Sequence, residues 1–237
     1  MGLFDEQLAQ VSAAMEGWRR ERTARDFQAA VRPSWPVESS LVLEEDTALE
    51  LGNPALASLF LLLWGETADV EDGRITLIGP DIPELQEARA PFALVVIAGG
   101  DFADEYDSYR DIRDAVYATR LEGLSVRMMP SRQTIWCRVS TGAMRKGLCA
   151  ADIGSALIDA IKEVEEVRAA EVLLVTSSVE DVRSLARPAN GARTVVDAMM
   201  KMYQEMNYDC DECEYQEVCD TVMGLKKIRE KLVDRKG

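Results

Sequence analysis

Histidine is absent from all 237 residues of the chain. This absence excludes catalytic triads that need an imidazole, histidine metal ligands, and acid–base chemistry by that side chain near neutral pH. Cysteine is scarce, with five residues, but three of them, Cys210, Cys213 and Cys219, lie close together near the C-terminus. These three thiols are therefore the best place in the sequence to look for a metal or a cluster.

Positive charge is also in short supply. Lys and Arg number 27 against 42 Asp and Glu, which gives a formal net charge of −15. Such a field repels the phosphates of nucleic acids and of anionic lipids, so we expect neither nucleic acid nor membrane as a partner. A basic or electron-carrying protein remains a suitable partner.

Long apolar runs are missing. No run approaches the ~18–20 residues that span a bilayer, and the acidic start of the chain lacks the basic-then-apolar pattern of a signal peptide. We therefore expect a cytoplasmic protein. In that reducing compartment, clustered cysteines are more often metal ligands than disulfides.

The apolar residues that are present, 47% of the chain, predict a folded core. Helical spacing of Leu8, Val11, Met15 and Trp18 predicts an amphipathic helix over residues 3–30, in an N-terminal arm of residues 1–36. The helix is expected to end before Pro33.

A main domain is expected over residues 37–190, and a helical segment with the cysteines over residues 191–237. Apolar runs predict strands at 40–44, 57–64, 74–78, 92–98, 133–139 and 171–176, with a hairpin turn at Asp72-Gly73. Helices are predicted at 103–121, 141–147, 153–164, 179–186 and 195–206, with a linker at 188–191. The pattern predicts an α+β fold, with helices packed on a mixed or antiparallel sheet and helical segments at both ends.

Four blocks of sequence resemble a known family. They are residues 49–55 (LELGNPA), 72–82 (DGRITLIGPDI), 132–140 (RQTIWCRVS) with Lys146-Gly147, and the Cys-x2-Cys motif at Cys210. In this order they resemble the middle domain, and the start of the cluster-binding domain, of the acetyl-CoA synthase subunit of the carbon monoxide dehydrogenase/acetyl-CoA synthase complex. The resemblance covers roughly residues 40–220.

The resemblance implies that Cys210, Cys213 and Cys219 match the first three thiolates of the nickel–iron–sulfur cluster. The sequence departs from the family, however, because it has no fourth cysteine after Cys219 and lacks the Cys-Gly-Cys segment that holds nickel. We therefore do not expect acetyl-CoA synthase activity from this chain alone, and no catalytic residue is assigned.

Three thiols at Cys-x2-Cys-x5-Cys spacing suit a [4Fe–4S] cluster whose fourth iron is open or held by a nearby carboxylate or a remote thiolate. Tetrahedral zinc with a borrowed ligand is an alternative, and free thiols are a third. Cys149 is the better remote candidate, whereas Cys137 lies in an apolar strand and is expected in the core.

Cations gather in one stretch of this acidic chain, at Arg127, Arg132, Arg138, Arg145 and Lys146. The resemblance implies that Arg132, Trp136 and Arg138 contact coenzyme A. Guanidinium groups pair with phosphates, and an indole face stacks on adenine, so the residue types suit that ligand. The plainer alternative is that the arginines pair with nearby acids while Trp136 packs in the core.

Three functions remain open from the sequence. The first is a stand-alone homologue of the middle domain that binds an iron–sulfur cluster and serves anaerobic one-carbon and acetyl-CoA metabolism as an accessory protein. The second is a subunit that completes a split acetyl-CoA synthase together with a separate chain. The third is a non-catalytic interaction module stabilised by zinc.

Overall fold

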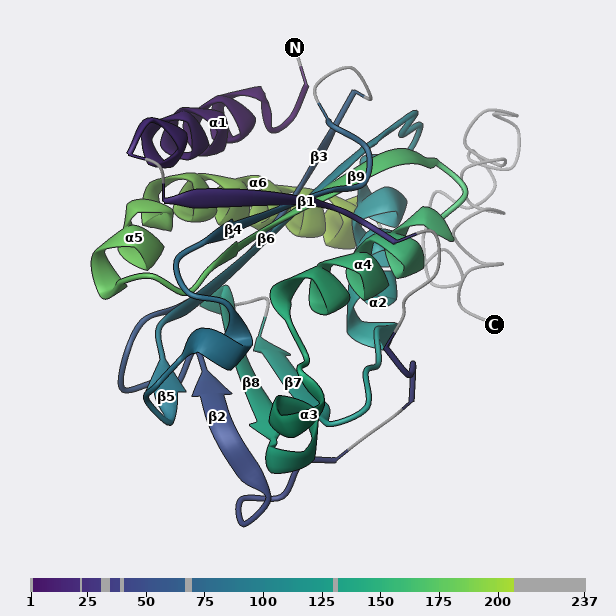
Figure 1. The fold of residues 1–237 in the computed structure, drawn as a ribbon. Helices are drawn as coiled ribbons and strands as arrows, with labels where there is room; N and C mark the ends of the chain where they lie inside the picture. Colours follow the sequence, from purple (N-terminus) through teal and green to yellow (C-terminus); the bar gives the residue numbers. More distant parts are fainter. Residues whose placement is uncertain are drawn as a thin grey trace, which may run out of the picture. The chain divides into compact units, whose positions relative to one another are not determined.

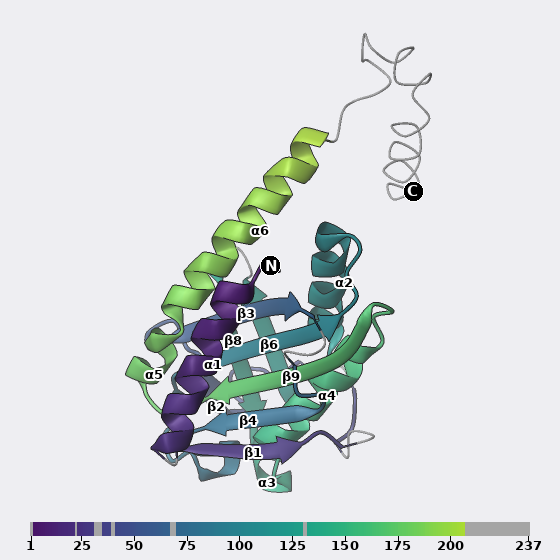
Figure 2. The same ribbon diagram turned by 90° about the horizontal axis from the view of Figure 1, so that it is seen from above.

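A five-stranded mixed sheet forms the centre of the main unit of the protein (Figure 1). The computed structural model describes residues 2–21, 23–30, 35–38, 41–66, 70–129 and 132–206. The strand order is β1 (Ala24–Gln28), β4 (Arg74–Ile78), β9 (Val167–Val175), β6 (Phe92–Gly100) and β3 (Ser58–Gly65), and Figure 2 lets the reader follow it from one edge to the other. The α+β class predicted from the sequence is confirmed.

The central strands β6 and β9 are mostly apolar because both faces of the sheet are covered. All but the last residue of β6 are buried, and so are all but one of β9. These two strands run antiparallel, whereas β9 with β4 and β6 with β3 are parallel pairs. Continuous Val, Leu and Ala runs are what a doubly covered sheet requires.

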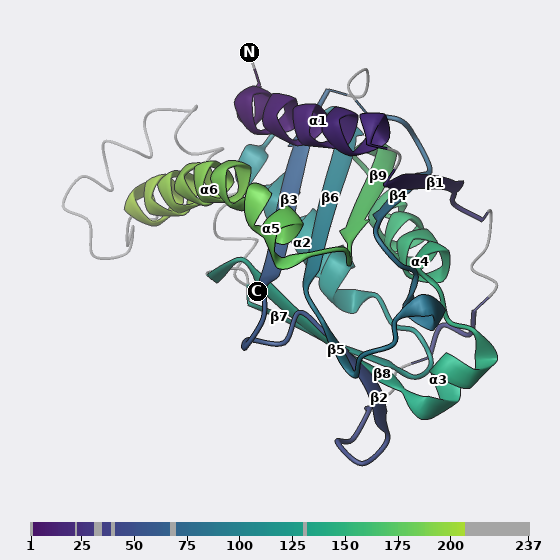
Figure 3. The same cartoon turned by 60° about the vertical axis from the view of Figure 1, so that its left-hand side comes forward.

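Helices cover the two faces of this sheet (Figure 3). One face carries α1 (Asp5–Arg20), α5 (Val179–Ser184) and the beginning of α6 (Ala186–Met206); Trp18 Nε1 of α1 donates to Asp181 of α5 at 3.0 Å. The other face carries α4 (Ala150–Lys162) and α2 (Glu105–Ala118). At Gly154 of α4 an added Cβ would lie 2.7 Å from Ile75 of β4, so a small residue is needed for this close packing.

A second sheet of four strands lies beside the first and positions the candidate site (Figure 1). Its order is β5 (Arg89–Ala90), β2 (Thr47–Leu51), β8 (Thr134–Ser140) and β7 (Leu124–Met129). In β8 every second residue is buried, so Ile135, Cys137 and Val139 face the core and Trp136 and Arg138 face outward. The short helix α3 (Thr141–Lys146) follows at once and ends at Gly147, whose φ of 85° closes it.

Several sequence-based predictions of secondary structure are wrong. The helix predicted over residues 3–30 ends at Arg20, and Ala24–Gln28 form strand β1. Residues 41–44, predicted as part of a strand, are not in one. Asp72-Gly73 does form a turn, but it does not join a hairpin, because β4 pairs with β1 and β9 rather than with β3. The linker predicted at 188–191 is helical, since Pro188 lies in the first turn of α6, where proline is tolerated.

The chain divides into two units, residues 1–195 and 196–237. Of the second unit, the structure describes the helical residues up to 206, so Cys210, Cys213 and Cys219 lie outside the described residues. None of the helices in the described ranges is long and apolar enough to cross a membrane.

Candidate functional site

Two arginines lie over one indole ring on the outward face of β7 and β8. The Cζ of Arg138 is 4.6 Å from the centroid of the Trp136 ring, and the Cζ of Arg127 is 5.4 Å from it. Arg138 reaches the ring because it stands two residues further along the same strand, and Arg127 because it is the direct cross-strand neighbour of Trp136. We call these three residues the Arg–Trp cluster.

The carboxylate of Glu50 balances part of this positive charge. Glu50 lies opposite Arg138 on β2, and its Oε1 is 3.5 Å from Arg138 Nε. That separation makes an ion pair but not a good hydrogen bond. The same carboxylate accepts from Arg89 Nε at 3.2 Å and from Asn53 Nδ2 at 2.5 Å. Glu50 therefore neutralises only part of the charge of Arg138 and its neighbours.

A cleft of about 200 Å³ adjoins the Arg–Trp cluster. It is lined by the cluster itself, by Ser125 of β7 and by residues 41–44, which include the acidic Glu44. Trp136 Nε1 and Arg138 Nε are buried, and neither has a hydrogen-bond acceptor among the described residues. Buried donors of this kind are usually satisfied, so an acceptor atom from a ligand would fit here.

Arg132, the third residue that the resemblance assigns to coenzyme A, lies apart from these contacts. It is exposed, and it precedes Gln133, whose φ of 51° turns the chain before β8 begins. Within the described part of the chain no ion pair or hydrogen bond joins it to the cluster. Lys146, another cation of this stretch, is held by Glu122 at 2.7 Å.

Trp136 is half-buried rather than enclosed in the core, and Arg138 and Lys146 each pair with an acid. The plainer alternative therefore fits the ion pairs of Arg138 and Lys146, but it does not fit the half-buried Trp136. Glu50 and residues 41–44 are parts of the site that the sequence did not single out. The i, i+2 spacing of Trp136 and Arg138 predicts their shared face, but the register with β2 and β7 is not visible in the sequence.

The cysteine prediction falls on residues that the structure does not describe. Among the described residues, no group of three or more Cys, Asp and Glu side chains could hold a metal ion. Cys137 is buried in the core, as predicted, and this burial raises its thiol pKa to about 12. Burial also raises the thiol pKa of Cys149 to about 11, and its Sγ donates to Asp152 at 3.1 Å.

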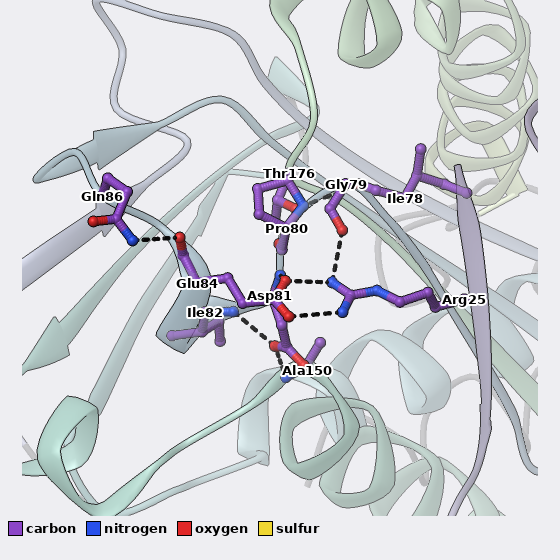
Figure 4. A network of polar contacts seen from close by, with 10 residues as sticks. All are labelled: Arg25, Ile78, Gly79, Pro80, Asp81, Ile82, Glu84, Gln86, Ala150 and Thr176. Carbon is purple, nitrogen blue, oxygen red and sulfur yellow. Dashed lines mark hydrogen bonds and ion pairs between the residues drawn. The ribbon is translucent and has the colours of Figure 1, made fainter. Parts of the chain in front are cut away.

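The Gly79-Pro80-Asp81-Ile82 segment has a structural role that Figure 4 makes visible. Asp81 Oδ1 accepts from Ile82 N, which starts the 3₁₀ turn η2 (Ile82–Glu84), and from Ala150 N at the beginning of α4, both at 2.7 Å. Gly79 has a φ of 104°, and a Cβ there would lie 2.5 Å from Ser177 N. A glycine is therefore required where this segment passes the end of β9.

Arg25 of strand β1 forms hydrogen bonds with the same segment. Arg25 donates to both carboxylate oxygens of Glu84, at 2.9 and 2.8 Å, and to Gly79 O at 2.8 Å (Figure 4). The hydrogen bonds from Arg25 lower the pKa of the Glu84 carboxyl to about 2. The segment thus ties together β1, β4 and α4, and none of these contacts needs a ligand.

Comparison with known proteins gives a consistent result. The family model described as "CO dehydrogenase/acetyl-CoA synthase complex beta subunit" matches residues 30–181, which is more than half of the chain. An acetyl-CoA decarbonylase/synthase complex subunit beta from Methanopyrus kandleri is 30% identical over 156 residues, covering 63% of this chain and 33% of the relative. The corresponding subunit from Archaeoglobus fulgidus is 28% identical over 125 residues, covering 52% and 23%.

A subunit beta 2 of the same complex, from Methanosarcina thermophila, is 24% identical over 164 residues, covering 68% of this chain and 34% of the relative. The chain therefore spans about a quarter to a third of the length of these curated relatives. The matched range includes both the Arg–Trp cluster and the segment at Asp81.

Proposed function

Because the chain belongs to the family of the CO dehydrogenase/acetyl-CoA synthase complex beta subunit, we propose that it works in a multi-subunit complex of this kind and recognises coenzyme A there. The observation on which this depends is the Arg–Trp cluster, which lies within the matched residues. A catalytic step is not assigned to any residue of this chain.

The chemistry of the cluster suits one end of coenzyme A. Guanidinium groups form paired hydrogen bonds with phosphate oxygens, and an indole face stacks on a nucleobase. Trp136 Nε1, which is buried and has no acceptor among the described residues, supports an acceptor-rich ligand. The adjoining cleft of about 200 Å³ is too small for the whole molecule, so we assign to it only the adenine or one phosphate group.

Arg127 is the residue that must move in this proposal. It is exposed, whereas Arg138 is half-buried and held by Glu50. Displacing Arg127 from the indole opens ring surface for adenine and frees its guanidinium for phosphate. Arg132, exposed just before β8, is assigned by the family resemblance to the same ligand and contributes a further positive charge.

Calorimetric titration with coenzyme A tests this proposal. We expect saturable binding that weakens about tenfold or more in Arg138→Ala, because a charge-assisted pair is lost, and that weakens in Trp136→Leu. Arg138→Lys should fall between, since it keeps the charge but loses the planar fork. The matched control is Arg113→Ala, which removes an arginine lying 5.5 Å over the Tyr109 ring, away from the cluster.

No heat of binding at millimolar coenzyme A, or equal weakening by Arg138→Ala and Arg113→Ala, contradicts the proposal. Circular dichroism of each variant separates lost contacts from lost folding.

A second proposal concerns the cysteines. We propose that Cys210, Cys213 and Cys219 hold a [4Fe–4S] cluster, with zinc as the alternative, and that the protein serves as an accessory component rather than as the acetyl-CoA-forming enzyme itself. The support is the Cys-x2-Cys-x5-Cys spacing. Iron and sulfide analysis of protein purified without oxygen tests this, and stoichiometric zinc in colourless protein favours the interaction module.

A third possibility is that the chain completes a split enzyme. It requires a stable complex with a separate nickel-bearing chain that forms acetyl-CoA only when both are present. Reconstitution of the purified chains measures this directly.

A further inference from the structure

A large cavity lies on the opposite face of β7 and β8 from the Arg–Trp cluster. Its volume is about 740 Å³, and it is lined by these two strands, by the end of α2, and by α4 and β6. Packing gaps in protein cores seldom exceed the size of a water molecule, whereas ligand pockets measure about 300–1,000 Å³. The cavity therefore has the size of a ligand site rather than of a packing defect.

The inner part of the cavity is apolar. Phe92 and Ile135 are each 1% exposed and Cys137 is 3% exposed, so they form its deep wall. Val126 of β7 is 38% exposed although it points to the same face as Cys137, its cross-strand neighbour. This exposure marks the open end of the cavity, because a residue on the inner face of a closed core would be buried.

The charge of the lining is opposite to that of the protein. The lining residues, all in the described part of the chain, include two arginines and no Asp or Glu, although the chain has 42 acidic residues. Arg127 places its guanidinium over Trp136 on the far face. Arg120 remains on the cavity side, where it donates to the backbone oxygens of Tyr117 and Thr119.

One residue of the lining carries a buried hydroxyl group. Tyr117 lines the cavity, and its hydroxyl oxygen is buried without a hydrogen-bond partner among the described residues. Burial raises the pKa of this phenol to about 12, so it keeps its proton at neutral pH. An unpaired buried hydroxyl costs free energy that an acceptor atom from a ligand would offset.

We propose that this cavity binds a medium-chain carboxylate, with its alkyl chain against Phe92 and Ile135 and its carboxylate near Tyr117 and Arg120. The apolar wall accounts for the chain, and the hydroxyl group and the cation, in a lining free of acids, account for the charged end. The alkyl chain uses the face of β8 opposite the Arg–Trp cluster, but the two sites share Ser125 and Arg127 of β7, which line both.

Displacement of cis-parinaric acid, a fluorescent fatty acid, from the full chain by decanoate tests the proposal. We expect saturable one-to-one binding. Tyr117→Phe should weaken the binding of decanoate about fivefold, which is the effect of one lost hydrogen bond. Decanol, which lacks the carboxylate, should bind the parent more weakly than decanoate does, and Tyr117→Phe should change its affinity little. Tyr106→Phe, on the same helix but outside the lining, is the matched control.

A second variant keeps the test valid if changes at Tyr117 alter folding. Val126→Glu places a negative charge at the open end, at a position exposed enough to tolerate it, and should abolish decanoate binding while the thermal midpoint stays near that of the parent. Decanoate binding that does not saturate, or that is equal in the parent, Tyr117→Phe and Val126→Glu, overturns the proposal.

Measuring the oligomeric state tests whether a second copy of the chain, rather than a carboxylate, occupies the cavity. A dimer that Val126→Glu converts to a monomer, without any decanoate binding, also overturns the proposal and assigns this face to a second copy of the chain. Light scattering of both proteins makes that measurement.

Discussion

The guanidinium of Arg138 lies 4.6 Å from the centroid of the Trp136 indole, and the two side chains share the outward face of one strand. Glu50 holds this arginine from β2, at 3.5 Å. The carboxylate both positions Arg138 and competes with any anion that approaches it. These two effects can be separated because an amide keeps the size and the acceptor oxygen of Glu50 but removes its charge.

We predict that Glu50→Gln strengthens coenzyme A binding about threefold or more, because one negative charge next to Arg138 is removed. Calorimetric titration at two salt concentrations measures the change, which should shrink at high salt. Glu122→Gln is the control, since Glu122 pairs with Lys146 elsewhere. Weaker binding in Glu50→Gln would show that positioning outweighs competition.

Asp81 should matter for stability rather than for binding. We predict that Asp81→Ala lowers the free energy of unfolding by about 1–3 kcal/mol, because the N–H groups of Ile82 and Ala150 lose their acceptor. Asp81→Asn keeps an acceptor oxygen and should lose less. Urea unfolding measures both variants, and coenzyme A affinity should be unchanged in each.

The Arg25–Glu84 pair predicts a particular pH dependence. The hydrogen bonds from Arg25 lower the folded-state pKa of Glu84 to about 2 from its ordinary value of 4.5. Its contribution to stability is therefore complete above about pH 4.5 and is lost as the pH falls toward 2. We expect Glu84→Gln to reduce the loss of stability across this window, as measured by urea unfolding at successive pH values.

The exposed Glu87 provides the control for this measurement. Glu87→Gln should leave the slope of stability against pH close to that of the parent. If Glu84→Gln and Glu87→Gln give the same slope, the contacts with Arg25 do not stabilise the fold.

The thiols should differ in reactivity. Burial raises the pKa of Cys137 to about 12 and that of Cys149 to about 11, so neither forms much thiolate at pH 8. We predict that iodoacetamide at pH 8 modifies Cys210, Cys213 and Cys219 first in metal-free native protein, and that a bound metal or cluster protects them. Peptide mass mapping identifies the sites; early modification of Cys137 would contradict the prediction.

The sequence predicted the elements whose signal is local. Strands β3, β4, β6, β8 and β9 are apolar or alternating runs, and α2, α3, α4 and α5 have clear periodicity or capping residues. Strand β1 was missed because Ala24–Gln28 is polar and lies at the edge of the sheet, where few of its residues are buried. Strand β7 was also missed, although four of the six residues of Leu124–Met129 are apolar; it lies at the edge of the second sheet, and only Leu124 is buried.

The pairing of strands that lie far apart in the sequence could not be predicted from the sequence. Asp72-Gly73 resembles a hairpin turn, but the partners of β4 come from residues 24–28 and 167–175. The same limit applies to the site. The shared face of Trp136 and Arg138 follows from alternation, while the approach of Arg127 and Glu50 depends on strand register, which only the tertiary fold supplies.

The alternating burial of strand β8 constrains the register of its residues. Deleting or inserting a single residue within Thr134–Ser140 would exchange inside for outside, burying an indole and a guanidinium and exposing the aliphatic side chains. A substitution in this strand therefore changes only one of its two faces. A one-residue insertion or deletion would exchange the residues of the two faces.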